Sequence, residues 1–91
     1  MDKQTLIQKC IDRTTQAYIK HGVTQANYAD KVMFNPRKKA AFDKIESGLQ
    51  NLIDNHPNIS TKRDDNGNKE SEIIMYNVCQ KALVNSTASR R

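Results

Sequence analysis

The sequence predicts an all-α fold, a compact bundle of three to four helices. In three separate stretches of the chain, apolar residues recur at steps of three and four, which places them along one face of a helix. Glycine, proline and asparagine stand between these stretches, where helices end. With 91 residues, the chain is long enough for one small domain.

The first predicted helix runs from Lys3 to Lys20. Its core-facing stripe consists of Leu6, Ile7, Cys10, Ile11, Thr14, Ala17 and Tyr18. We expect the helix to stop at Gly22, because glycine readily takes the left-handed conformation that closes helices. The basic residues collect on the opposite side: Lys9, Arg13 and Lys20.

Two further helices are expected before residue 57. A short one, from Gln25 to Met33, would start at Thr24, whose hydroxyl can accept a hydrogen bond from a free backbone N–H group. Asn35 and Pro36 then form a cap and a helix start. The apolar positions of this third helix are Phe42, Ile45, Leu49, Leu52 and Ile53. Gly48 leaves open whether the helix divides in two.

The polar stretch 58–69 predicts a short β-ribbon or a mobile loop. Asn66-Gly67 is typical of a hairpin turn, whereas residues 69–72 are poor strand formers. The last helix is predicted from Ser71 to Asn85, so that residues 1–85 form a single domain. Residues 86–91 are expected to fray as a C-terminal tail.

The last predicted helix is apolar on two sides, which favours burial against a partner. Its core face consists of Ile74, Met75, Val78, Cys79 and Ala82. The other side is interpreted as a protein interface, in a homodimer or with another protein, and consists of Ile73, Tyr76, Leu83 and Val84.

Composition bounds the location and the chemistry. Uninterrupted apolar runs reach only three residues, whereas a membrane span needs about 20. The first residues, Met-Asp-Lys-Gln-Thr, lack the apolar stretch expected of a secretory signal. We therefore expect a cytoplasmic protein without a membrane partner, in which Cys10 and Cys79 are reduced. Together with His21 and His56 they lack the paired spacing of zinc ligands. No metal, cofactor or small-molecule substrate is expected, and the absence of catalytic motifs indicates a non-enzymatic protein.

The formal charge of +5 is concentrated between residues 31 and 44. Five basic residues there accompany a single acid, Asp43. At a helix start such residues can bind phosphates through side-chain charge and free backbone N–H groups. The alternative is that they only solubilise the first turn, since they do not fall on one stripe.

Part of this region resembles a helix-turn-helix of the phage-repressor type. The resemblance is carried by Thr24-Gln25, Ala29, Lys31-Val32 and Phe42. It departs from the family at Met33, where a turn glycine is usual, at the apolar position of Lys39 and at Pro36. The resemblance implies that Arg37 and Lys38 face DNA, and that a 58–69 ribbon carrying Lys62 and Arg63 acts as a wing.

The sequence thus predicts a small basic regulatory protein that binds nucleic acid, preferably duplex DNA, through a basic helix start. The predicted binding residues are Lys31, Arg37, Lys38, Lys39, Lys44, Lys62 and Arg63. The alternative is a protein-binding inhibitor, antitoxin or adaptor. It would dock an acidic partner surface through its last helix and its basic face.

Overall fold

Three long helices and one short π-helix form the regular structure of residues 2–89, the part of the chain that the computed structural model describes. The elements are α1 (Lys3–Lys20), η1 (Ala29–Met33), α2 (Pro36–Asp54) and α3 (Glu70–Ala88). Between residues 2 and 89 there is no strand. The predicted all-α bundle is confirmed.

Helix α1 has the predicted bounds, and local signals account for both ends. The Asp2 carboxylate accepts a hydrogen bond from the backbone N–H of Thr5 at 2.7 Å, which satisfies one of the free donors of the first turn. At the other end Gly22 has a φ of +68°. The chain then turns back, and the Val23 N–H donates to the Tyr18 carbonyl at 2.8 Å.

The expected helix Gln25–Met33 is wrong in its length and in its cap. The side chain of Asn27 accepts a hydrogen bond from the Thr24 N–H at 2.8 Å and donates to the Gly22 carbonyl at 3.1 Å. These bonds hold the chain in turns, because an asparagine side chain competes with the helical backbone for partners. Regular structure starts only at Ala29. The first helix of the helix-turn-helix resemblance is therefore not formed.

Helix α2 starts at the predicted signal and continues past Gly48 to Asp54, so the helix does not divide. The Asn35 side chain caps it by accepting from the Lys38 N–H at 3.3 Å, and Pro36 occupies the first turn. The prediction that Leu52 belongs to the core is wrong, because 51% of its surface is exposed.

Helix α3 is longer than predicted at its C-terminal end. The Ser86 hydroxyl donates to the Val23 carbonyl and is fully buried, which anchors the last turn of α3 to the loop after α1. Residues 86–88, which the sequence assigned to the tail, therefore belong to α3. Residues 90 and 91 of the predicted tail lie outside the described residues.

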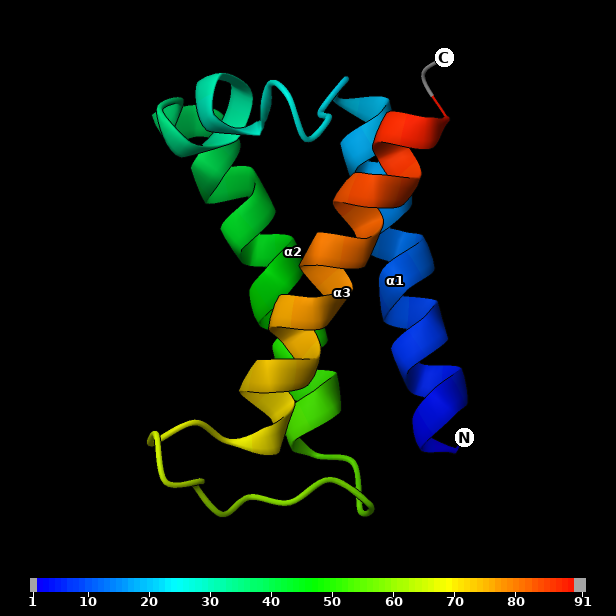
Figure 1. The fold of residues 1–91 in the computed structure, drawn as a ribbon, viewed down its shortest axis with the longest axis vertical. Helices are drawn as coiled ribbons and strands as arrows, with labels where there is room; N and C mark the ends of the chain where they lie inside the picture. The colour runs from blue at the N-terminus through cyan, green and yellow to red at the C-terminus, as the bar shows by residue number, and fades with distance from the viewer. Residues whose placement is uncertain (1, 90–91) are drawn as a thin grey trace.

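Helix α3 is central, because it packs extensively on α1 and also on α2, whereas α1 and α2 contact each other least (Figure 1). Two apolar clusters hold the three helices together. The lower one consists of Leu6, Cys10, Ile11, Leu49, Ile53, Ile59, Met75 and Val78. The upper one consists of Tyr18, Val23, Val32, Phe42, Ala82 and Leu83.

The 58–69 stretch is a loop closed by a single antiparallel bridge between Arg63 and Lys69. Its tip turns at Gly67, which has a φ of +81°, and the Asp64 carboxylate accepts hydrogen bonds from the backbone of Asn66 and Asn68 at 2.9 Å each. The predicted turn is present without the two strands of a ribbon. Within residues 2–89, no helix is long and apolar enough to cross a membrane.

Candidate binding groove

The predicted nucleic-acid-binding residues do not form one surface. Lys31 and Arg37 belong to η1 and the start of α2, at the upper end of Figure 1. Lys62 and Arg63 belong to the loop at the lower end, and the molecule is 36 Å long. The wing implied by the helix-turn-helix resemblance is therefore on the wrong end of the molecule to assist Arg37.

Several of these basic side chains already have partners within the chain. The Lys38 ammonium donates to His21 Nδ1 at 2.8 Å, and Lys39 pairs with Asp43 at 3.5 Å. Arg63 pairs with Glu72 at 3.5 Å. The carboxylates of Asp43 and Glu72 partly offset the positive field that would attract a phosphate backbone. The His21 pKa is lowered by burial and by the neighbouring Lys38. The imidazole is therefore neutral at neutral pH and adds no positive charge to this surface.

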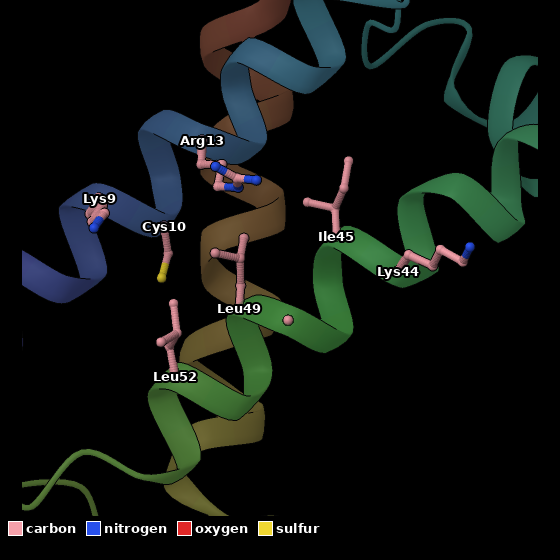
Figure 2. Close-up of a pocket in the computed structure, with 8 residues that line it drawn as sticks. Lys9, Cys10, Arg13, Lys44, Ile45, Leu49 and Leu52 are labelled. Atoms are coloured by element: carbon pink, nitrogen blue, oxygen red, sulfur yellow. The ribbon is translucent and has the colours of Figure 1, made fainter.

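A different basic surface lies between α1 and α2, around a cavity of about 490 Å³. Figure 2 shows the side chains that line it. We call it the α1–α2 groove. Its lining residues come from both helices: Lys9, Cys10, Arg13, Lys44, Ile45, Gly48, Leu49 and Leu52. The groove exists because both helices pack on α3 and have little contact with each other.

The floor of the α1–α2 groove is apolar. Cys10 and Leu49 are buried there with 0% and 4% of their surface exposed, and Ile45 is half-buried. Figure 2 shows Cys10, Leu49 and Leu52 facing the gap between the helices. Burial raises the pKa of the Cys10 thiol, so Cys10 packs as a small apolar residue and not as a nucleophile.

The edges of the groove are positively charged. Lys9 and Arg13 come from α1, Lys44 comes from α2, and no acid is among the lining residues. Figure 2 shows Arg13 extending from α1 toward the gap, while Lys44 extends outward from α2. Among the residues that the structure describes, none of these three cations forms an ion pair.

Gly48 lies inside helix α2 at this groove. A Cβ atom added to it would meet nothing within 4 Å, so the fold itself has no steric need for glycine here. Glycine in a helix interior costs about 0.5–1 kcal/mol relative to alanine. The helix therefore carries this cost at an exposed position that lines the groove.

Of the four residues predicted to form an interface on α3, three are exposed and one is buried. Ile73, Tyr76 and Val84 are exposed by 42%, 66% and 50%. Leu83 is wrong as an interface residue, because only 8% of it is exposed and it belongs to the upper cluster with Tyr18. Helix α3 packs on both other helices, which buries a wider arc of its surface than one partner helix would.

Two half-buried titratable groups, Glu46 and Cys79, join α2 and α3. The Cys79 thiol donates to the Glu46 carboxylate at 3.6 Å. Burial raises the pKa of Glu46, and burial together with Glu46 raises the pKa of Cys79 to about 12. The thiol is therefore protonated at neutral pH, and both cysteines are free. In the described part of the chain, no cluster of three or more metal-ligating side chains occurs.

Sequence patterns indicated the parts of this groove without bringing them together. Lys9 and Arg13 follow from the polar side of the first helix, and Lys44 from the basic segment. The missed residues are Gly48 and Leu52, and no local signal marks them as lining a groove.

Comparison of the chain with protein-family models, with curated proteins and with solved structures gives no match.

Proposed function

We propose that this chain is a non-enzymatic module that binds an acidic segment of a partner protein in the α1–α2 groove. One observation carries the proposal: a cavity of about 490 Å³ has an apolar floor, three cations and no acid among its lining residues. Burial of the partner's apolar side chains on this floor would stabilise the complex, because it removes apolar surface from water. Acidic side chains beside them would meet Lys9, Arg13 and Lys44, which favours fast and selective association.

The groove suits a protein segment better than a nucleic-acid backbone. Nucleic-acid affinity depends mainly on cations that neutralise successive phosphates, and an apolar floor gives phosphates and sugars little to bind. A protein interface, in contrast, typically combines an apolar centre with a polar edge and is enriched in arginine. The cytoplasm is the proposed location, because the free thiols Cys10 and Cys79 persist in a reducing compartment.

Duplex DNA binding through the start of α2 is the second candidate function. It is favoured by Lys31 and Arg37, which are both exposed and, within the described residues, form no ion pair. A gel shift of duplex DNA, with an affinity that falls steeply as the salt concentration rises, would support this candidate. Unchanged binding of duplex DNA by the variant Lys31→Ala/Arg37→Ala would contradict it.

The test of the proposed function is charge reversal in the groove. The variant Lys9→Glu/Arg13→Glu/Lys44→Glu changes three exposed side chains and should fold, as checked by circular dichroism. Its matched control is Lys20→Glu/Lys62→Glu/Lys81→Glu, which makes the same change of charge at exposed positions outside the groove.

Affinity capture from a host extract, with and without nuclease, then compares the three proteins. The wild type and the control should retain the same nuclease-resistant partner protein, and the groove variant should lose it. Retention by the wild type should also weaken as salt rises, because exposed charges are screened. Equal retention by the groove variant, or loss of all captured protein after nuclease treatment, would contradict the proposal.

A further inference from the structure

We propose that the occupant of the α1–α2 groove is an amphipathic α-helix of the partner, which crosses α2 at Gly48 and completes a four-helix bundle. The inference rests on the proposed function and specifies the form of the partner. It follows from the spacing of the lining residues, the glycine among them and the position of the charges.

The lining residues of α2 have the spacing of a helix-packing hole. Ile45, Gly48, Leu49 and Leu52 stand at steps of three, one and three, which is the set of four residues that accepts one side chain of a facing helix. On α1, Lys9, Cys10 and Arg13 repeat three of the four positions of such a set. A helix laid in the groove would therefore find packing positions on both sides.

Gly48 is the residue that makes this hole deep. It stands one turn from Lys44 and one turn from Leu52, in the same row of side chains along α2. Because glycine has no Cβ, this row is interrupted by a notch between the two larger residues. A glycine with no steric reason inside its own fold is expected where a second backbone approaches closely.

The exposed apolar surface fits the same occupant. Leu52 leaves 51% of its surface exposed at one end of this row, and the neighbouring lining residue Leu49 is buried in the lower cluster. A leucine of the partner helix inserted at Gly48 would contact both. Because the row from Lys44 to Leu52 rises about 12 Å along α2 at 1.5 Å per residue, an occupant of two to three turns covers it.

The charges determine which helix fits. Lys9 and Arg13 lie on the α1 side of the apolar floor and Lys44 on the α2 side. The partner helix should therefore carry an apolar stripe with acidic residues on both of its flanks, as in helices that bind an apolar groove and place charges beside the packing seam.

A second copy of this chain fits the groove less well than another protein. Its exposed helical face on α3 contains Ile73, Tyr76 and Val84. The acids at the start of that helix are already paired, Glu70 with Lys3 and Glu72 with Arg63. They are therefore less available to the groove cations of a neighbouring copy.

The experiment uses a displayed library of 14-residue peptides on the full chain. Three leucines are fixed at helical spacing, and the flanking positions are randomised. We expect acidic residues to be enriched at the flanks. Selected peptides, measured by fluorescence anisotropy, should bind Gly48→Leu about tenfold more weakly or worse, because the added side chain fills the position of a buried anchor. Their affinity for the exposed control Lys81→Ala should not change.

Folding should not confound this test, because the Cβ atom of a side chain at position 48 meets nothing within 4 Å and leucine has a higher helix propensity than glycine. The melting temperature of Gly48→Leu should equal or exceed that of the wild type. The inference is overturned if no helical peptide is enriched, if the flanks are not acidic, or if the binders tolerate Gly48→Leu. Light scattering that shows a wild-type dimer and a Gly48→Leu monomer would identify a second copy as the occupant and also overturn it.

The peptide selection tests the helical form of the partner, and the charge-reversal variant tests the proposed function, so the two can fail independently. If the peptides fail while the groove charge-reversal variant still loses its host partner, the partner is acidic but does not bind as a helix. If the peptides bind as expected and the charge-reversal variant keeps its host partner, the groove binds acidic helices but is not the site of that partner.

Discussion

Two neighbouring threonines on α1 allow a direct test of the core. Thr14 and Thr15 are both buried, with 2% and 8% of their surface exposed. The Thr15 hydroxyl donates to the Ile11 carbonyl at 2.7 Å. The Thr14 hydroxyl is buried and has no hydrogen-bond partner in the described structure. We therefore expect the substitution of valine to have different consequences at the two positions.

Valine keeps the β-branched shape and replaces the hydroxyl with a methyl group. At Thr14 the change removes an unsatisfied buried group, whose desolvation costs about 1–3 kcal/mol. The free energy of unfolding of Thr14→Val should therefore rise by about 1–2 kcal/mol. At Thr15 the change also removes a hydrogen bond that contributes about 0.5–1.5 kcal/mol, and the buried methyl group offsets about this amount. Thr15→Val should therefore be close to neutral.

Urea denaturation followed by far-UV circular dichroism measures both variants against the wild type. In a domain of this size, each kcal/mol corresponds to a change of about 4–8 °C in the melting temperature, so thermal melts provide a second measurement. Equal m-values would show that both variants unfold from similarly compact states. If Thr14→Val is no more stable than Thr15→Val, the Thr14 hydroxyl is not an unsatisfied group and the reasoning is refuted.

Two more predictions test the burial assignments. Leu83→Glu should lower the melting temperature strongly by placing a carboxylate in the upper cluster, whereas Val84→Glu, at a half-exposed position, should change it little; equal shifts in scanning fluorimetry would contradict the assignment of Leu83 to the core. Burial raises the Glu46 pKa, so the folded state binds this proton more tightly than the unfolded chain, and stability should fall as the pH rises through the range just above the ordinary glutamate pKa. Glu46→Gln cannot titrate and should lose that fall, and urea titrations at a series of pH values will measure it; an unchanged pH profile would show that Glu46 is not its source.

The elements that sequence patterns predicted well are those fixed by local signals. The bounds of α1 follow from its apolar stripe and from Gly22, and the start of α2 follows from Asn35 and Pro36. Such signals act within one or two turns of the chain, so neighbouring residues are sufficient to recognise them.

The mistaken elements depend on particular side-chain contacts. A good helix cap at Thr24 lost to the two hydrogen bonds of the Asn27 side chain, and the end of α3 depends on Ser86 reaching Val23, 63 residues away. Periodicity contains no information about the second contact. Leu83 was assigned to the wrong surface for a related reason, because the number of helices that pack on α3 determines how much of its circumference is buried.

The candidate groove was predictable in its charges but not in its shape. Lys9, Arg13 and Lys44 are recognisable as exposed cations from the helical pattern alone. Their placement around one cavity requires that α1 and α2 both pack on α3 and leave a gap between themselves. That arrangement is a property of the tertiary structure, and no spacing within one helix encodes it.

Two features of α2 that lower the stability of the folded chain, the exposed Leu52 side chain and the glycine at position 48, lie at the proposed binding site. A small domain with 36% hydrophobic residues has little apolar surface to leave unused, because its folded state is only marginally stable. Yet Leu52 is 51% exposed, and Gly48, one turn away, costs about 0.5–1 kcal/mol of helix stability. Either feature alone is ordinary on a protein surface. Both occur in one row of α2, beside three cations that form no ion pair within residues 2–89, and binding an acidic helix would compensate for both at once. Local rules of stability are commonly broken at functional sites, and the coincidence of these features supports placing the proposed binding site at this row.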